Sequence, residues 1–406
     1  MNVLLVTEPG VDGVFRYVEA LAHHLIEQGH EVHLAYSAQR GSDHLVALVA
    51  FVQQHGGRTV NLDTGNRPAL RDFKAGWRLF QLVREVRPDL IHSHSSKAGG
   101  LARLLPLLGV FQPQFYHPHA YAGMRPDFGT MRLLYNGIES VLGRFAHTVN
   151  CSRDEQHFAR RTLRLPEHRT LLVPNGVNIT HFSPLEPAKK RELRERLGLP
   201  LDAVILGSMG RTSAQKDPQT LYRAFALAAA RHPNLLLYHV GQGEFDGELN
   251  AFIREHGLKQ RVIRHAYLSA PVEFHRAVDG FILTSRYEGF SLAVLEALAC
   301  NQPLILSDGP GNNELATESL SHAQWVKVGD VEGFSQAISN WLTGLSRSEN
   351  SLGCNHRAVA EKNFSSQRNL SRVLELYRKF APHSTAGPPV PTTDPDRTDP
   401  KPAVAL

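Results

Sequence analysis

Short apolar runs alternate with longer amphipathic stretches along most of this chain of 406 residues, and the series occurs twice. The apolar runs lie at 3–6, 32–36, 90–92 and 115–117, and again at 204–208, 235–240, 281–284 and 304–306. Helical periodicity fills segments between them, for example at 17–28, 221–231 and 293–299. Such strand–helix alternation predicts parallel sheets covered by helices on both faces. We therefore predict an α/β fold of two doubly wound, Rossmann-like domains that face a central cleft.

A polar stretch flanked by prolines, from Pro174 to Pro187, separates the two series. Such stretches favour linkers, so we place the domain boundary there. The predicted N-terminal domain is 1–175 and the predicted C-terminal domain is 176–363. A further helix is expected at 364–382, after a break near Asn363. The tail at 383–406 is rich in proline and threonine, and we expect it to be disordered because it has little apolar surface to bury.

The composition excludes several classes of protein. Hydrophobic residues at 42% and charged residues at 20% indicate a soluble globular chain. No run approaches the ~18 apolar residues of a membrane span, and no signal peptide is recognisable, so we expect a cytoplasmic protein. The three cysteines are far apart, and no His/Cys spacing suggests a zinc site, so no resident metal is expected. The net charge of +5 leaves a nucleic acid, an anionic membrane or a phosphorylated molecule open as partners.

The most specific segment surrounds Glu288 and Glu296. Glu288 follows a predicted strand, and Glu296 lies one to two turns into the next predicted helix. Gly289, Phe290 and Ser291 form the approach to that helix, with Ser291 as its expected N-cap. Free backbone amides at the start of a helix attract anions, so this loop is a candidate phosphate site.

Two cations, Arg211 and Lys216, lie between the first strand of the second series and the following helix. Arginine offers a planar fork of donors and lysine a point charge, so the pair could hold a diphosphate at the same sheet edge as Glu288. Gly241, after the next strand, and Gly13, after the first strand of the chain, lie in turns where backbone could approach such a ligand. The turn at Gly13 is not GxGxxG, which counts against NAD.

The segment from Glu288 to Glu314 resembles the Glu-x7-Glu motif of the family-4 retaining glycosyltransferases, which have the GT-B fold. In that family the first glutamate lies near the donor sugar and the second binds the nucleotide ribose. The resemblance therefore implies a catalytic role for Glu288 and a donor-binding role for Glu296. Asn301 stands where the family usually has glycine, and Asn312 belongs to a pair that replaces more apolar residues.

The same resemblance implies a nucleotide-sugar donor, with a UDP-sugar favoured and a GDP-sugar as the alternative. Arg211 and Lys216 match the family's diphosphate-binding pair, and Gly13 and Gly241 match glycine turns beside the donor. Cations and helix amides would neutralise the leaving diphosphate, so we expect no metal cofactor. The implied GT-B fold also returns the helix at 364–382 to the N-terminal domain.

Two histidine-rich strand ends of the first series are candidates for the acceptor side. The segment with His94 and Lys97 resembles a variant found in enzymes that build exopolysaccharide, capsule and lipid-linked glycans, lipopolysaccharide among them. His119 matches a family histidine near the reacting sugar and could bind a sugar hydroxyl or carry a proton. For His92, His94 and His117, taken singly, a structural role is the alternative explanation.

One predicted helix near residue 68 carries a basic stripe flanked by aromatic residues. The stripe comprises Arg67, Arg71, Lys74 and Arg78, with Phe73 and Trp77 beside it. Such a face fits an anionic membrane surface, where a lipid-linked acceptor would be found. The alternative is a solvated basic face with the two aromatic rings packed on the sheet.

These observations predict a retaining glycosyltransferase of cell-surface polysaccharide biosynthesis, acting on a glycan or lipid-linked acceptor at or near the inner face of the membrane. No nucleic-acid-binding module is recognisable, so a nucleic-acid partner is not expected. Two alternatives stay open: a nucleotide-sugar epimerase of the same architecture, and a non-catalytic subunit that binds sugar nucleotides. Acceptor-dependent release of the nucleoside diphosphate would separate the three.

Overall fold

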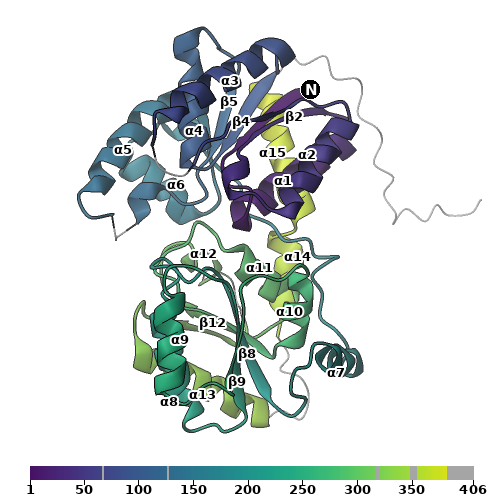
Figure 1. The fold of residues 1–406 in the computed structure, drawn as a ribbon, viewed down its shortest axis with the longest axis vertical. Coiled ribbons are helices and arrows are strands. Elements are labelled where there is room, and N and C mark those ends of the chain that lie inside the picture. The colour runs from purple at the N-terminus through teal and green to yellow at the C-terminus, as the bar shows by residue number, and fades with distance from the viewer. Residues whose placement is uncertain (66–67, 126–127, 317, 319, 348–353, 382–406) are drawn as a thin grey trace, which may run out of the picture.

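Two parallel β-sheets, each between layers of helices, form the two domains of the computed structural model, which describes residues 1–65, 68–125, 128–316, 318, 320–347 and 354–381 (Figure 1). This architecture confirms the predicted α/β class with two doubly wound domains. The predicted tail at 383–406 and Arg67 of the basic stripe lie outside the described residues. Among the described helices, none has the length and apolar character needed to cross a bilayer.

The N-terminal domain is built on a 7-stranded parallel sheet. In spatial order its strands are β3 (Thr59–Asn61), β2 (Glu31–Tyr36), β1 (Asn2–Thr7), β4 (Leu90–His94), β5 (Gln114–His117), β6 (His147–Asn150) and β7 (Thr170–Leu172). The central strands β1 and β4 are almost wholly buried. Parallel strands between two helical layers expose neither face, which is why β1 is apolar from Val3 to Val6 and why even the polar side chains of β4 are buried.

Helices cover both faces of this sheet. One face packs against α1 (Asp12–Glu27), α2 (Asp43–Gln54) and α15 (Ser366–Phe380), which share one hydrophobic core with the strands. Right-handed crossovers place the other four helices on the opposite face: α3 (Arg71–Val86), α4 (Ser96–Arg103), α5 (Met131–Leu142) and α6 (Arg153–Arg161). Short 3-10 turns connect these elements: η1 (Ala38–Arg40), η2 (Leu105–Leu108), η3 (Ala122–Met124), η5 (Gly143–Phe145) and η6 (Glu167–Arg169).

The C-terminal domain repeats the design with a 6-stranded parallel sheet. Its strands, in spatial order, are β10 (Val262–His265), β9 (Leu235–Val240), β8 (Val204–Met209), β11 (Gly280–Leu283), β12 (Leu304–Ser307) and β13 (Ala323–Val326). Its helices are α7 (Pro187–Arg196), α8 (Pro218–Ala229), α9 (Asp246–Glu255), α10 (Pro271–Ala277), α11 (Leu292–Ala299), α12 (Asn313–Ala316), α13 (Val331–Arg347) and α14 (His356–Asn363). They divide into two cores, one on each face of the sheet.

The chain crosses between the domains twice, and the two crossings lie side by side. The amide of Val177 donates to the carbonyl of Phe364 over 2.8 Å, and the amide of Ser366 donates back to Val177 over 2.9 Å. After the second crossing α15 packs on the N-terminal domain, with Val373 and Tyr377 fully buried. Figure 1 shows this yellow helix among the purple elements of the upper domain. The predicted return of the last helix is therefore confirmed.

Every predicted apolar run lies in or against a strand of the structure, usually extended by a residue at either end. The strands that the sequence did not reveal are β3, β6, β7, β10 and β13, which have only three or four residues each. β6, with the sequence HTVN, is polar at both ends and has no apolar alternation. Pairing with a neighbouring strand, rather than local propensity, determines such strands.

Candidate active site

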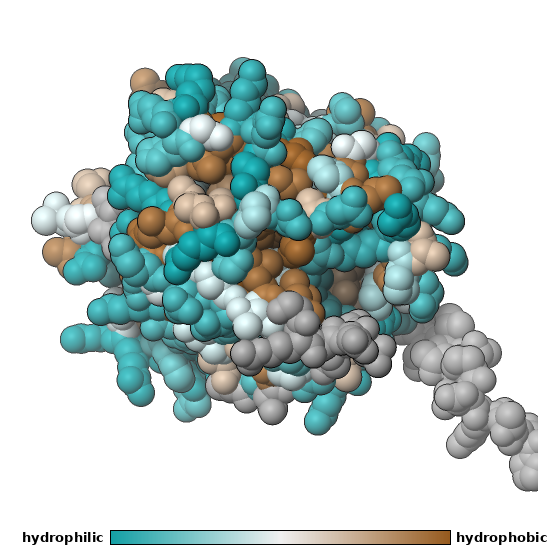
Figure 2. Space-filling model, turned by 90° about the horizontal axis from the view of Figure 1, so that it is seen from below, coloured by the Kyte–Doolittle hydropathy of each residue, from teal (hydrophilic) through white to brown (hydrophobic). Residues whose placement is uncertain are grey.

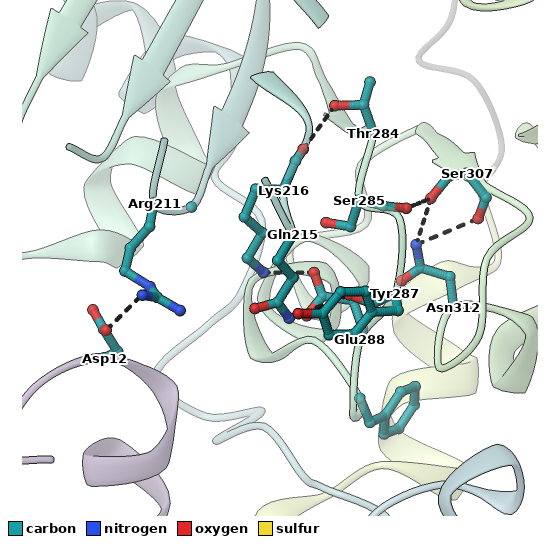
Figure 3. A network of polar contacts seen from close by, with 12 residues as sticks. Asp12, Arg211, Gln215, Lys216, Thr284, Ser285, Tyr287, Glu288, Ser307 and Asn312 are labelled. Atoms are coloured by element: carbon teal, nitrogen blue, oxygen red, sulfur yellow. Dashed lines mark hydrogen bonds and ion pairs between the residues drawn. The ribbon is translucent and has the colours of Figure 1, made fainter. Parts of the chain in front are cut away.

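The carboxyl ends of β8 and β11 bring together two loops, which we call the cation loop (residues 210–217) and the glutamate loop (residues 284–291) (Figure 3). Lys216 donates from Nζ to Oε1 of Glu288 over 2.5 Å. Glu288 is only 5% exposed, so its charge is compensated within the protein. The sequence prediction that Lys216 and Glu288 share one sheet edge is thus met by direct contact between them.

Backbone hydrogen bonds join the two loops. The amide of Arg286 donates to the carbonyl of Gln215 over 2.8 Å, and the Gln215 amide group donates to the carbonyl of Tyr287 over 3.2 Å. Thr284 donates from its hydroxyl to the carbonyl of Lys216 over 3.1 Å. These contacts, drawn in part in Figure 3, fix the Lys216–Glu288 geometry from both sides.

Glycines stand where the backbone packing around these loops leaves no room for a side chain. A Cβ on Gly241, whose φ is +145°, would lie 1.9 Å from the carbonyl oxygen of Gly210. A Cβ on Gly311 would lie 2.3 Å from the carbonyl oxygen of Glu288. The backbone at Gly241 is therefore packed closely against the cation loop, and its approach to a nucleotide stays a prediction.

Glu296 lies on α11 and is 4% exposed. Its carboxylate pairs with Arg16 of α1 over 2.9 Å and with Nε2 of His275 of α10 over 3.2 Å. Arg16 comes from the N-terminal domain, so this contact bridges the two domains. These two contacts fix the orientation of the Glu296 carboxylate. A carboxylate that binds a ligand through one oxygen needs such a fixed orientation.

Arg211 also reaches across the domain boundary. Its Nε lies 3.4 Å from Oδ2 of Asp12, and both side chains are about half exposed. Asp12, with φ +64°, begins α1, so the helix starts before the position predicted from the sequence. Gly13 therefore lies within the first helical turn, where an added Cβ would make an ordinary 3.6 Å contact with Leu292. The structure places Gly13 against α11 of the other domain.

Two of the predicted loop residues have structural contacts. Phe290 is buried and its ring packs edge-on against Phe364 at 5.2 Å. Its carbonyl accepts from the Asn175 amide group over 2.8 Å, which ties the glutamate loop to the first crossing. Ser291 is the N-cap of α11 by position, but its hydroxyl makes no capping bond to that helix. Ser291 therefore occupies the predicted N-cap position, but its side chain does not make the predicted capping hydrogen bond.

The N-terminal domain contributes His119 and Ala120, which we call the histidine turn. Both residues have positive φ, 54° and 87°, which side chains disfavour. The buried carboxylate of Glu155 accepts from the amides of Ala120, over 2.5 Å, and Cys151, over 2.7 Å. Across the boundary, a Cβ on Gly289 would lie 2.9 Å from the amide nitrogen of Ala120. The histidine turn and the glutamate loop are thus in direct backbone contact.

Burial lowers the pKa of His119 to about 3, so its ring is neutral near pH 7. Its Nε2 lies 3.2 Å from Nδ1 of His94, and its ring stacks on that of His117 at 3.9 Å. A neutral imidazole can exchange hydrogen bonds with a sugar hydroxyl, but it does not bring a positive charge. Of the two uses predicted for His119, this environment favours hydrogen bonding.

His94 and Lys97 both have partners within the N-terminal domain, and their place on the acceptor side stays a prediction. His94 is fully buried and reaches the domain boundary only through His119. Lys97 donates to Asp72 over 2.6 Å, and its side chain is 11% exposed. It joins α4 to α3, which explains a cation at this position without an acceptor.

Two buried groups of side chains have the composition of metal ligands. Candidate ligand atoms of His92, His94 and His117 lie within 4.8 Å of one another, and so do those of His117, Cys151 and Glu155. Their members come from neighbouring strands and a helix, so a search for short His/Cys spacings in the sequence does not find them. The expectation of a metal-free enzyme stays a prediction.

Residues 11–181 match the sequence family described as Glycosyltransferase Family 4, and residues 189–358 match the family described as Glycosyl transferases group 1. A D-inositol 3-phosphate glycosyltransferase of Xylanimonas cellulosilytica is 30% identical over 316 residues, which cover 72% of this chain and 74% of that protein. The chain belongs to glycosyltransferase family 4. The predicted family and enzyme class are therefore confirmed.

A second relative and a solved structure are also similar to this glycosyltransferase. The UDP-Gal:alpha-D-GlcNAc-diphosphoundecaprenol alpha-1,3-galactosyltransferase of Escherichia coli is 26% identical over 319 residues, which cover 77% of this chain and 81% of that protein. The crystal structure of Anabaena HepE in complex with UDP-glucose has a TM-score of 0.77 at 21% identity, covering 93% of this chain and 100% of HepE. That likeness confirms the GT-B fold.

The sequence did not identify Arg16, Asp12 and Glu155 as residues of the candidate site of this glycosyltransferase. Arg16 and Asp12 are helix residues of the first domain, and their partners Glu296 and Arg211 belong to the second. For Glu155 a local signal existed, because Ser152 and a glutamate three residues later form the pattern of a capping box. The amide of Glu155 does donate to the Ser152 hydroxyl, over 3.2 Å, but the carboxylate bonds outside the helix.

Proposed function

We propose that this glycosyltransferase moves a sugar from a UDP-sugar to a glycan or lipid-linked acceptor, with retention of the anomeric configuration. The observation that carries the proposal is the ion pair of partly buried Lys216 with buried Glu288, held 2.5 Å apart at adjacent strand ends, where the glutamate loop contacts the histidine turn of the other domain. A cation and a carboxylate so arranged suit the two charges that develop during glycosyl transfer.

Those charges are opposite in sign. The sugar becomes oxocarbenium-like while the diphosphate leaves with growing negative charge. Lys216 and Arg211 would stabilise the leaving diphosphate, exchanging their present partners Glu288 and Asp12 for its oxygens. Glu288, released from Lys216, would face the positive sugar carbon. We infer on these grounds that no metal ion is required, and turnover in the presence of EDTA tests that inference.

The donor is best identified by binding. A ligand that binds only the folded protein raises its melting temperature. We expect UDP and UDP-sugars to raise it more than GDP, ADP and their sugars, at equal concentrations. HepE was crystallised with UDP-glucose, which supports the choice of base. A larger shift with GDP than with UDP would overturn the choice of UDP while leaving a nucleotide-sugar donor in place.

The acceptor is proposed to be a lipid-linked or growing glycan of a cell-surface polysaccharide, met at the cytoplasmic face of the membrane. Support comes from the Escherichia coli relative, whose name specifies a diphosphoundecaprenol-linked acceptor. A set of diphosphoundecaprenol-linked sugars should each be tested with the preferred donor. Release of UDP only when donor and acceptor are both present indicates transfer, and the anomeric proton couplings of the product show whether configuration is retained.

The same assay separates the alternatives. An epimerase would convert the donor sugar without an acceptor, and a non-catalytic subunit would bind UDP without releasing it from a UDP-sugar. Either result across the acceptor set would overturn the proposed transfer reaction.

A further inference from the structure

Helix α5 carries its apolar stripe on the outside of the molecule. Met131, Leu134, Ile138, Val141 and Phe145 recur at intervals of three and four residues along α5 and η5, the spacing of one helical face. These five side chains are between 42% and 57% exposed. A stripe of this kind normally packs on a core, so α5 needs a partner outside the domain.

The inner face of α5 is instead held by a polar anchor. Glu139 is buried and accepts from Arg103 of α4 over 2.7 Å and from the Tyr116 hydroxyl of β5 over 3.1 Å. Arg103 is almost fully buried, and its guanidinium stacks on Tyr116 at 3.7 Å from the ring centre. This ion pair fixes which side of α5 faces inward. The outward direction of the apolar stripe is therefore specified by the fold.

Neighbouring elements extend the exposed apolar surface. Leu70, Phe73 and Trp77 at and after the start of α3, and Leu104, Leu107, Leu108 and Phe111 around η2, are each at least 46% exposed. Together with the α5 stripe they form what we call the docking face. Among the described residues, the exposed large hydrophobic side chains outside 70–145 are Val46, Leu227 and Tyr267. Seen from the far end of the C-terminal domain, hydrophilic side chains surround a central group of hydrophobic residues (Figure 2).

The ionised side chains on the docking face are cationic. Arg71 and Lys74 of α3 and Arg132 of α5 are exposed. The carboxylates of these two helices are paired within the protein: Asp72 with Lys97, Glu85 with Arg58, and Glu139 with Arg103. An apolar surface with uncompensated cations is complementary to a bilayer that contains anionic lipids.

We propose that the docking face lies on an anionic lipid bilayer and inserts the α5 stripe into it. The inference deepens the proposed function, because it rests on a lipid-linked acceptor being the substrate. The segment 121–130, which includes η3, separates the histidine turn from α5 along the chain, and α5 packs on η3. Seating α5 in the membrane would thus bring the acceptor side of the enzyme to the lipid surface. The basic stripe predicted from the sequence supplies one edge of this face, and Phe73 and Trp77 are exposed rather than packed on the sheet.

Vesicle flotation of the full chain tests the proposal. Vesicles of phosphatidylcholine with phosphatidylglycerol should carry the protein upward, and pure phosphatidylcholine vesicles should carry much less. Leu134→Asp with Ile138→Asp should lower the bound fraction about tenfold or more, since each places a charge at the lipid contact. Arg71→Ala with Lys74→Ala should reduce the dependence on phosphatidylglycerol. The matched control is Val46→Asp, on α2 at the other face of the sheet, which should float like the parent.

Two results would overturn the proposal that the docking face lies on a lipid bilayer. One is flotation of the Leu134→Asp, Ile138→Asp variant equal to that of the parent. The other is that the parent fails to bind vesicles, that light scattering shows it to be a dimer, and that the Leu134→Asp, Ile138→Asp variant is a monomer. In that case a second copy of the chain covers the docking face. Unchanged melting temperatures show that the exposed substitutions leave the fold intact. Because these vesicles contain neither donor nor acceptor, flotation succeeds or fails independently of glycosyl transfer.

Discussion

The glutamate loop and the histidine turn meet at the domain boundary, yet they reach their backbone conformations by different means. On the C-terminal side, glycine stands where a Cβ would not fit, as at Gly241 and Gly311. On the N-terminal side, His119 and Ala120 have positive φ in spite of their side chains, and buried Glu155 holds the turn. The first conformation is encoded in residue types that can be recognised in a sequence. The second depends on a partner brought in by the tertiary fold.

The two sides differ in charge as well. The C-terminal side presents cations whose present partners are carboxylates, Lys216 with Glu288 and Arg211 with Asp12. The N-terminal side presents His119 above fully buried histidines whose pKa values burial lowers. The rings of these histidines are therefore neutral near pH 7. This difference fits a charged leaving group on one side and uncharged sugar hydroxyls on the other.

The largest expected effect tests the charged side. Lys216→Ala should lower acceptor-dependent UDP release by about 10²–10³-fold, the usual cost of one electrostatic contact to a developing charge. It also leaves buried Glu288 without its cation, which should destabilise the fold. Steady-state rates at saturating donor, with unfolding midpoints in urea, measure the two effects separately.

A second substitution separates lost charge from lost stability. Glu288→Gln in the Lys216→Ala chain removes the uncompensated carboxylate, so the urea midpoint should recover while turnover stays low. Lys259→Ala, an exposed lysine of the same domain, should leave both quantities unchanged. Recovery of turnover together with stability would show that Lys216 supports the fold and has no part in the reaction.

The next effect concerns the backbone of the C-terminal side. Gly241→Ala should lower the free energy of unfolding by about 2 kcal/mol or more, because its Cβ would collide with Gly210 at a φ that alanine disfavours. Gly247→Ala on α9 is the matched control, since nothing lies within 4 Å of an added Cβ there. That change should stabilise the protein by up to ~1 kcal/mol through helix propensity. Urea unfolding at pH 7 measures both, and a destabilisation of equal size at the two sites would contradict the packing argument.

The residues of the two sides also differ in how well they could be predicted from the sequence. The strand–helix alternation predicted both sheets. Lys216 and Gly241 were predicted at the ends of their strands from residue type and position, and the structure places Lys216 against Glu288 and Gly241 against Gly210. Arg16 and Glu155 could not be predicted in the same way. Their partners, Glu296 and Ala120, lie on other elements, and only the assembled domains bring them within hydrogen-bond distance. The pairing of Lys97 with Asp72 of α3 likewise joins two elements and could not be predicted from the motif that contains Lys97.

Acid should destabilise the protein through the buried histidines of the N-terminal side, among others. Burial places the folded-state pKa of His94, His117 and His119 below the ordinary histidine value of about 6.5. Below pH 6.5 the unfolded chain therefore binds more protons than the folded one, so stability falls as pH falls. Each histidine contributes ~1.4 kcal/mol per pH unit, down to its folded pKa. Burial raises the pKa of Glu155, so this carboxyl acts in the opposite direction, between its ordinary pKa and its raised folded-state pKa.

Urea midpoints at pH 7, 6 and 5 measure this slope. His117→Gln removes one titrating ring, so its stability should change with pH less steeply than that of the parent, by ~1.4 kcal/mol per unit. His44, an exposed histidine of α2, provides the control variant His44→Gln, whose slope should match the parent. Parallel slopes for the parent and His117→Gln would show that the buried histidines do not lose protons on folding.

The smallest expected effect comes from the opposite substitution, alanine to glycine, at Ala120. At Ala120, with φ +87°, glycine removes a side-chain strain of ~1–2 kcal/mol, whereas its greater freedom in the unfolded chain costs ~0.5–1 kcal/mol. Ala120→Gly should therefore stabilise the protein by about 0.5 kcal/mol. The control is Ala230→Gly, at a helical φ of −62° and exposed, which should destabilise it by up to ~1 kcal/mol. Opposite signs at the two alanines would show that the histidine turn is held in its conformation against the preference of its own residues. A loss of stability at Ala120 would mean that Glu155 and the contact with Gly289 impose no strain there, and that the two sides of the boundary differ in residue type alone.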